Sequence, residues 1–314
     1  MNEHAVGRVV PALDLGGTYA KGAVIDAGDG TALWETRWDV PRGLTADGLV
    51  EQVATWCEHL LGQAARRLGH PADCLGVAVP GIVDDATGTA GFSANLGWRN
   101  QPLRARLAER LDFPVTLCHD VTAAGVGEAA FGAGRAAHTV LTVVAGTGIG
   151  GVLTIGGQPY RGAHHGAVEL GHLPVADLTG LCGCGGRGHL ETVAAGPAIV
   201  RRYNAATPAA PAADVPEVLA RAAAGDATAA AFWDEAVAAF GRAVAQAVIL
   251  LDPEVVVLAG GLSRSGAALR APVAASLAST LTFHEPPPVL TSLLGDRAGV
   301  IGTALTAVRE RTHG

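Results

Sequence analysis

Residues able to do chemistry are most concentrated in ELGHLPVADLTGLCGCGGRGHLE, residues 169–191. Four side chains in this stretch could bind one metal ion: His172, Cys182, Cys184 and His189. Two thiolates and two imidazoles can complete a closed tetrahedral zinc site, which leaves no position for an activated water. The predicted role of the metal is therefore structural, and it would hold residues 172–191 in one shape. The alternative is that His189 lies in solvent and that zinc binds weakly or not at all.

A second group of candidate residues is the glycine run at 146–151. Gly146, Gly148 and Gly151 satisfy G-x-G-x-x-G, which marks a dinucleotide site only where a strand precedes it and a helix follows. The VLTIGG that follows is strand-like, so the Rossmann interpretation is disfavoured. The motif G-x-x-x-x-G-K-[ST] does not occur in the sequence, which excludes a P-loop enzyme. We expect instead two glycine hairpins, at 8–26 and 139–157, that face one another across a cleft.

The first hairpin contains DLGGTYAK, residues 14–21, with several groups suited to phosphate. At Gly16 and Gly17 the missing Cβ would let backbone N–H groups approach phosphate oxygens, and Thr18 adds a hydroxyl. Asp14 could orient a hydrated Mg²⁺, and Lys21 is the only lysine of the chain. The alternative is that a tight hairpin needs its glycines anyway and that Lys21 merely caps it.

A candidate general base ends the strand-like PVTLCHD. Phosphoryl transfer to a hydroxyl needs positioning, charge neutralisation by Mg²⁺, and a carboxylate that accepts the hydroxyl proton. Asp120 stands at the end of this apolar segment, where α/β folds place catalytic groups. The alternative is a helix cap, because VTAAGVGEAAFG follows it.

The elements that must position these residues alternate between strands and helices, which indicates an α/β protein. The strand–glycine turn–strand pattern at 8–26 returns at 139–157 and suggests two halves built alike. A long helix is predicted at about 226–251, and residues 203–216 are predicted to be a loop. The final AGVIGTALTAVRER is predicted to be a helix that packs back on the N-terminal half.

Composition narrows the class of protein. The chain has 314 residues, of which 16% are charged, and its net charge of −7 argues against nucleic-acid binding. Its most apolar stretch is interrupted by Asp252, Pro253 and Glu254, so no membrane span is expected. Only two of the five cysteines are close together, and no signal peptide is recognised. These features predict a cytoplasmic protein without a disulfide framework.

Seven motifs carry a resemblance to a known family: DLGGTYAK, VPGIVD, NLGW, HD, GTGIGG, ELGH and CGCGGRGHLE. In this order they resemble the ROK family (repressors, open reading frames and kinases), from about residue 9 to the C-terminus. The resemblance implies a two-domain α/β protein with the actin-like ATPase (ribonuclease H-like) fold and an interdomain cleft for ATP and sugar. The implied N-terminal domain is residues 1–120 plus about 296–314, and the C-terminal domain is residues 121–295 with the zinc-binding loop.

The resemblance also implies roles for individual residues. Asp120 would take the proton from the C6 hydroxyl of a hexose. Further sugar contacts would come from Asn95, His119, Glu169, His172 and Glu191. ATP would be bound by Asp14, Gly16, Gly17, Thr18, Lys21, Gly146, Thr147, Gly148, Gly260 and Gly261. His172 would serve both sites, with one ring nitrogen on zinc and the other on the sugar.

Two residues depart from the family pattern. His189 stands where the family has a third cysteine, and it keeps a donor that zinc can use. His119 stands where the family usually has Asn, and an imidazole offers one donor or acceptor on each nitrogen with more bulk. Glucose therefore has competitors as the acceptor: kanosamine, glucosamine, N-acetylmannosamine or a C7-cyclitol.

The expected activity is that of an ATP-dependent sugar 6-phosphotransferase, with ATP, Mg²⁺ and structural Zn²⁺ as cofactors. A DNA-binding repressor is disfavoured because DLGGT begins at residue 14 and leaves no room for a preceding DNA-binding domain. A catalytically silent sugar-binding protein is disfavoured by Asp120, Lys21 and both hairpins. The resemblance implies a homodimer or homotetramer, and it leaves open whether polyphosphate can replace ATP.

Overall fold

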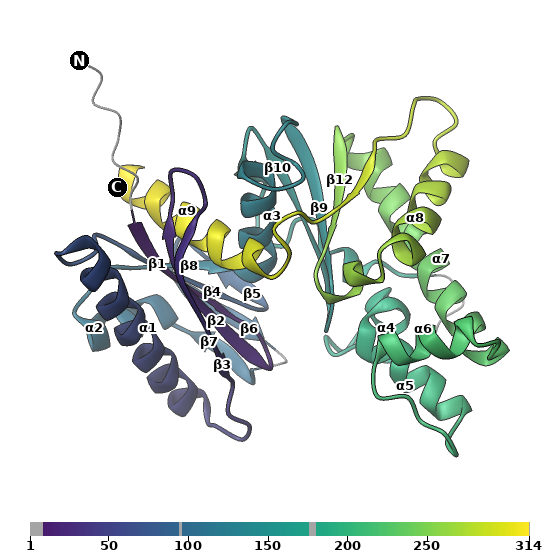
Figure 1. Ribbon diagram of the computed structural model, residues 1–314, viewed down its shortest axis with the longest axis horizontal. Helices are drawn as coiled ribbons and strands as arrows, with labels where there is room; N and C mark the ends of the chain where they lie inside the picture. The colour runs from purple at the N-terminus through teal and green to yellow at the C-terminus, as the bar shows by residue number, and fades with distance from the viewer. Residues whose placement is uncertain (1–8, 94–95, 176–179, 314) are drawn as a thin grey trace. The chain divides into compact units, whose positions relative to one another are not determined.

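The computed structural model describes residues 9–93, 96–175 and 180–313 (Figure 1). Its contacts divide the chain into two units. The first unit runs to Gly132 and also includes Arg161–Gly166 and the chain from Asp296 onward. The second comprises Ala133–Tyr160 and Ala167–Gly295.

The first boundary differs from the one expected at residue 120. That residue is the start of helix α3 (Asp120–Ala130), and the contacts keep all of α3 in the first unit. The physical reason is that α3 packs along α9 (Ala298–His313), the last helix of the chain. The prediction that the final helix returns to the N-terminal half is confirmed.

A five-stranded sheet with the order β3-β2-β1-β4-β8 forms the centre of the first unit. Its strands are β1 (Val9–Leu15), β2 (Tyr19–Asp26), β3 (Ala32–Asp39), β4 (Leu75–Val79) and β8 (Val115–His119). β1 pairs antiparallel with β2 and parallel with β4, which runs parallel to β8. The hairpin predicted at 8–26 is confirmed, with Asp14 directly opposite Lys21.

Helices pack on both faces of this sheet, with α9 on one side and α1 (Ala46–Leu68) with α2 (Leu103–Leu111) on the other (Figure 1). α1 begins at Thr45, whose side chain accepts a hydrogen bond from the Gly48 N–H, and ends at Gly69 with a left-handed φ of 75°. Leu13 and Leu15 of β1 belong to the core that α1 and α2 complete. Because side chains alternate along a strand, Asp14 points to the opposite face, towards α9.

The second unit repeats the sheet of the first, in the order β11-β10-β9-β12-β13. Its strands are β9 (Thr139–Ala145), β10 (Ile149–Ile155), β11 (Gln158–Pro159), β12 (Val255–Ala259) and β13 (Val289–Thr291). β9 pairs antiparallel with β10 and parallel with β12, as β1 does with β2 and β4. The predicted similarity of the two halves and the predicted second hairpin are therefore confirmed.

The helices of the second unit pack mainly around α7 (Ala227–Leu251), whose predicted extent is confirmed to within one residue. The others are α4 (Glu191–Ala194), α5 (Gly196–Ala206), α6 (Val215–Ala223) and α8 (Ala267–Thr280), with short 3-10 helices at Leu170–His172 and Gly261–Ser265. α7 begins at Asp226, whose carboxylate accepts from the N–H groups of Thr228 and Ala229. The loop predicted at 203–216 is shorter than expected, because α5 continues to Ala206 and α6 starts at Val215.

A small antiparallel sheet of β5 (Ile82–Asp84), β6 (Thr89–Ser93) and β7 (Trp98–Gln101) completes the first unit. This sheet was not predicted from the sequence. Among the described residues, no helix is long and apolar enough to cross a membrane.

Candidate active site

In the first unit, Asp14 and Lys21 form the most buried part of the predicted phosphate site. They face each other across the β1–β2 hairpin, and Lys21 Nζ lies 3.9 Å from Asp14 Oδ2. The Asp14 side chain is only 15% exposed, because α9 packs directly over it. A Cβ on Gly299, at the start of α9, would collide with the Asp14 carboxylate. Glycine at 299 therefore leaves the room that this carboxylate occupies.

The burial of Asp14 has an electrostatic consequence. Desolvation raises the pKa of its carboxyl group to about 7, the neighbouring Lys21 opposes the shift, and the carboxylates of Asp120 and Asp296 add to it. A divalent cation beside Asp14 would favour the ionised form. The turn itself is closed by a hydrogen bond from the Gly16 N–H to the Tyr19 carbonyl oxygen. Gly17 and Thr18, at the tip of the turn, are exposed.

The predicted base, Asp120, is the first residue of α3, directly after β8. Its Oδ1 accepts a hydrogen bond from the Val121 N–H at 2.8 Å. The same oxygen lies 3.1 Å from Nε2 of His119, so the residue that departs from the family pattern contacts the candidate base. The Asp120 side chain is 29% exposed, so it is partly accessible to solvent. Asn95 lies outside the described residues.

In the second unit, the β9–β10 turn places Gly146, Thr147 and Gly148 beside the glycine pair that follows β12. A Cβ on Gly146 would lie 3.6 Å from the Gly261 nitrogen, so the two glycine segments are neighbours. Gly260 has φ 82°, and a Cβ there would be 2.5 Å from the Ala145 carbonyl oxygen. The structure therefore brings together the predicted nucleotide-binding residues of this unit.

Glu191 belongs to the same neighbourhood. It is the first residue of α4, and its Oε2 accepts a hydrogen bond from the Ile149 N–H at 3.0 Å. Thr147 and Glu191 both line a cavity of about 410 Å³, which is also bordered by Cys182 and Arg201. One cavity is thus lined by the glycine turn, by a glutamate that is predicted to bind the sugar, and by the candidate metal loop.

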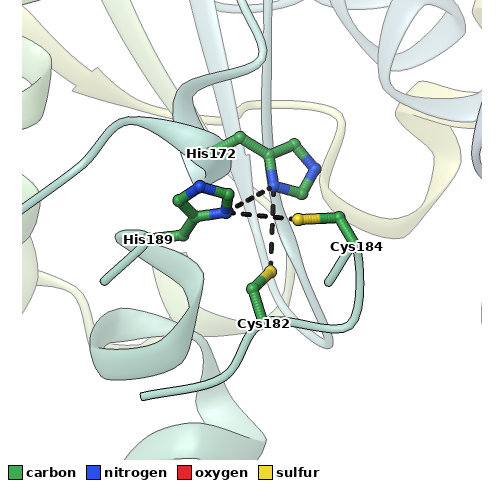
Figure 2. A group of neighbouring side chains, drawn as sticks. All are labelled: His172, Cys182, Cys184 and His189. Carbon is green, nitrogen blue, oxygen red and sulfur yellow. Dashed lines mark hydrogen bonds between the residues drawn. The ribbon is translucent and has the colours of Figure 1, made fainter. Parts of the chain in front are cut away.

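The candidate metal ligands converge, as Figure 2 shows. The Nδ1 atoms of His172 and His189 lie 3.3 Å apart. Cys182 Sγ is 3.8 Å from His172 Nδ1, and Cys184 Sγ is 3.3 Å from His189 Nδ1. A zinc tetrahedron with Zn–S of about 2.3 Å and Zn–N of about 2.0–2.1 Å has ligand–ligand edges of about 3.3–3.8 Å. The donor types and spacing fit a zinc ion.

Backbone hydrogen bonds bring these four residues together. The Leu190 N–H donates to the Leu173 carbonyl oxygen, and the Val175 N–H donates to that of Gly188, so the chain after His172 runs beside the chain around His189. A tight turn is closed by the Cys182 N–H, which donates to the Gly186 carbonyl oxygen. Burial raises the pKa of the Cys182 thiol, whereas a bound metal cation would favour the thiolate.

His172 and Glu169 connect this cluster to the predicted sugar contacts. While Nδ1 of His172 faces the cluster, its Nε2 lies 4.0 Å from Glu169 Oε2. Both side chains remain more than a third exposed, at 39% and 36%. The preceding Val168 has φ 63°, a left-handed conformation that is costly for a β-branched residue. The backbone before Glu169 is therefore held in an unusual shape by its surroundings.

One cluster of charged groups was not predicted from the sequence. Asp85 forms an ion pair with Arg161 and lies 3.2 Å from Nδ1 of His165, whose Nε2 is 3.6 Å from Asp84. Hydrogen bonds from Thr87 hold the pKa of Asp84 below its usual range. These contacts tie residues 161–166 to the first unit although the chain on either side belongs to the second. Only the adjacent pairs Asp84–Asp85 and His164–His165 could have drawn attention to it in the sequence.

Comparisons with known proteins agree with this arrangement. The family model of the ROK family matches residues 10–310. The glucokinase of Thermotoga maritima is 33% identical, over 96% of this chain and 98% of its own length. The N-acetyl-D-glucosamine kinase of Escherichia coli O157:H7 is 31% identical, over 93% of this chain and 96% of its own. The crystal structure of a ROK family glucokinase from Streptomyces griseus in complex with glucose and AMPPNP has a TM-score of 0.80 and 30% identity, covering 96% of this chain and 99% of that one.

These matches extend over nearly the whole chain and include both units. They confirm the two-domain, actin-like ATPase fold that the resemblance implied. Because the family model covers almost every described residue, the chain belongs to the ROK family.

Proposed function

We propose that the protein is an ATP-dependent sugar kinase that transfers the γ-phosphoryl group to the primary C6 hydroxyl of a hexose, glucose or a close analogue. The observation that carries the proposal is the end-to-end match to sugar kinases at 31–33% identity. The candidate base, the glycine turns and the sugar-binding carboxylates stand at the matching motifs of this chain.

Asp120 acts as the general base in this proposal. Its Oδ1 is engaged by the Val121 N–H and His119, so its other oxygen accepts the proton of the sugar hydroxyl. The hydroxyl oxygen forms a bond to the γ-phosphorus as the bond to the β–γ bridging oxygen breaks. ADP leaves with that bonding pair, and the proton remains on Asp120 until it passes to solvent.

The nucleotide is held by the glycine turns, with Lys21 near the phosphates and Asp14 orienting a hydrated Mg²⁺. Mg²⁺ supplies charge neutralisation on the phosphate oxygens. In the second unit, Gly146, Thr147 and the Gly260–Gly261 pair bind the rest of the nucleotide. Their adjacency within that unit supports the assignment.

A zinc ion bound by His172, Cys182, Cys184 and His189 is the structural part of the proposal. The donor set and its 3.3–3.8 Å spacing support it. Because the four residues would fill a tetrahedral site, a bound zinc ion would hold the loop in shape and would not activate a water. A zinc ion there would hold Nδ1 of His172, which would leave Nε2 and the nearby Glu169 to bind the sugar hydroxyls together with Glu191.

The second candidate is a kinase for an amino sugar or a C7-cyclitol. Two observations favour it: His119 replaces the usual Asn beside the base, and an N-acetyl-D-glucosamine kinase is 31% identical to this chain, the same identity as the glucokinase of Streptomyces coelicolor. The imidazole contacts Asp120 and cannot present the donor and acceptor pattern of an amide to the sugar at the same time.

Replacing the base tests the catalytic assignment. In Asp120→Asn, kcat should fall by about 10²–10⁴-fold while the sugar Kd changes little, because an amide keeps the shape but accepts no proton. Coupled-assay kinetics and calorimetric sugar binding measure the two quantities. Ser93→Ala, a conservative change at a buried site in β6, serves as the control for general damage to the first unit. An Asp120→Asn enzyme with wild-type kcat would remove Asp120 from the mechanism.

A further inference from the structure

The carboxylate of Glu191 is held by the glycine turn of the second unit. Ile149 begins β10 and is paired with Ala145 across the hairpin, so the direction of its N–H is set by the hairpin. This N–H donates to Glu191 Oε2 at 3.0 Å. In a second hydrogen bond, the Gly196 N–H donates to the Gly146 carbonyl oxygen at 3.0 Å. The turn and the α4–α5 segment are therefore connected at two points.

Gly148 has no space for a side chain beside this carboxylate. A Cβ there would lie 2.6 Å from Glu191 Oε2, closer than carbon and oxygen atoms pack. The clash is with the free end of a flexible side chain, so the carboxylate would move and the backbone would not. Gly146 provides a contrast, because its Cβ would make an ordinary contact of 3.6 Å with the Gly261 nitrogen. Both glycines have φ outside the left-handed region, so alanine fits either backbone.

We propose that Gly148 and the Ile149 N–H are positioning groups for sugar binding, because they fix the Glu191 carboxylate from the nucleotide turn. The glycine leaves the room, and the amide fixes the direction of the carboxylate. This inference rests on the proposed function, in which Glu191 binds sugar hydroxyls. It assigns to the glycine turn a second role, beyond its contacts with the nucleotide.

A kinetic double-mutant cycle tests the positioning role. With D-glucose and Mg-ATP, Gly148→Ala should raise the KM for glucose at least tenfold and shift the thermal melting temperature little. The matched variant Gly146→Ala should raise the KM for Mg-ATP and leave that for glucose within twofold. In a Glu191→Ala background at saturating Mg-ATP, Gly148→Ala should change kcat/KM for glucose less than twofold, because the displaced group is gone.

Hydrogen exchange gives a second readout that does not depend on activity. Removing the acceptor in Glu191→Ala should speed exchange of the Ile149 amide at least tenfold, whereas Glu191→Gln, which keeps an acceptor oxygen, should retain much of the protection. Unchanged exchange in Glu191→Ala, or a Gly148→Ala effect that persists in that background, would overturn the inference alone. A wild-type enzyme that phosphorylates no sugar would overturn the proposed function and this inference with it.

Discussion

At the scale of single residues, Asp14 links the chemistry to stability. Its carboxyl group has a pKa of about 7 in the folded chain and 3.8 in the unfolded chain. The folded state therefore binds this proton more tightly, and the stabilisation is complete below pH 4 and is lost as the pH rises through 7. The difference corresponds to at most about 4 kcal/mol.

This decrease of stability with rising pH leads to a prediction for the ligand-free protein. In Asp14→Asn, which mimics the protonated acid, the free energy of unfolding should exceed that of the wild type near pH 8 and by a smaller amount near pH 5, and the two should converge below pH 4. Urea denaturation at the two pH values measures the difference, and the other titrating groups cancel because both proteins carry them. Parallel pH profiles of the two proteins would contradict the burial argument.

The sequence identified the types of the site residues better than their contacts. Asp14, Lys21 and Asp120 could be chosen because their motifs are local. The contact of His119 with Asp120 and the hydrogen bond from Ile149 to Glu191 depend on side-chain and tertiary geometry. The cluster of Asp85, Arg161 and His165 joins residues that are far apart in sequence, so no local sequence pattern predicts it.

At the scale of elements, both hairpins, α7 and α9 could be predicted because each has strong periodicity or a glycine turn. The sheet of β5, β6 and β7 could not, because its strands are only three to five residues long and one is irregular. Such short strands carry too little alternation to distinguish them from loops.

The packing of α3 against α9 should be sensitive to any increase in side-chain volume between the two helices. A Cβ on Gly302 would collide with the Ala123 carbonyl oxygen, so Gly302→Ala should destabilise the protein by about 1–3 kcal/mol and lower kcat by displacing α3, which begins with Asp120. The control is Gly62→Ala in α1, where the added carbon meets only Arg66 at 3.9 Å. That change should stabilise the protein by about 0.5–1 kcal/mol. Thermal melting compares them, and equal effects would contradict the packing argument.

The metal loop is an element whose shape should depend on its ion. Purified wild-type protein should contain about one zinc per chain by mass spectrometry, and Cys184→Ala should lose most of it together with sugar affinity, because three ligands leave the coordination open. Cys57→Ala, which changes a buried thiol in α1 that is not among the four candidate ligands, should retain the zinc. A metal-free wild-type protein with full activity would contradict the structural role.

At the scale of the whole molecule, the two units share the same arrangement of strands in their five-stranded sheets. In each, an antiparallel hairpin is followed by a parallel strand at its inner edge, and the turn of the hairpin carries the glycines. The repeated hairpin could be recognised in the sequence because the two strands of each hairpin are consecutive along the chain. The strand order could be anticipated only through the family resemblance, because the pairing of β1 with β4 and of β9 with β12 joins distant segments.

The most direct test of the proposed kinase activity is ADP release with Mg-ATP across a panel of acceptors. The panel holds glucose, mannose, allose, glucosamine, N-acetylglucosamine, kanosamine, N-acetylmannosamine and a C7-cyclitol, with wild type and His119→Asn compared. We expect the wild type to turn over at least one acceptor, with kcat/KM of about 10⁴ M⁻¹s⁻¹ or more and phosphate on the acceptor's primary hydroxyl. If the best acceptor of the wild type is an amino sugar or cyclitol, His119→Asn should shift the preference towards glucose. ADP release no faster than in the acceptor-free control, for every compound, would contradict the proposed kinase activity.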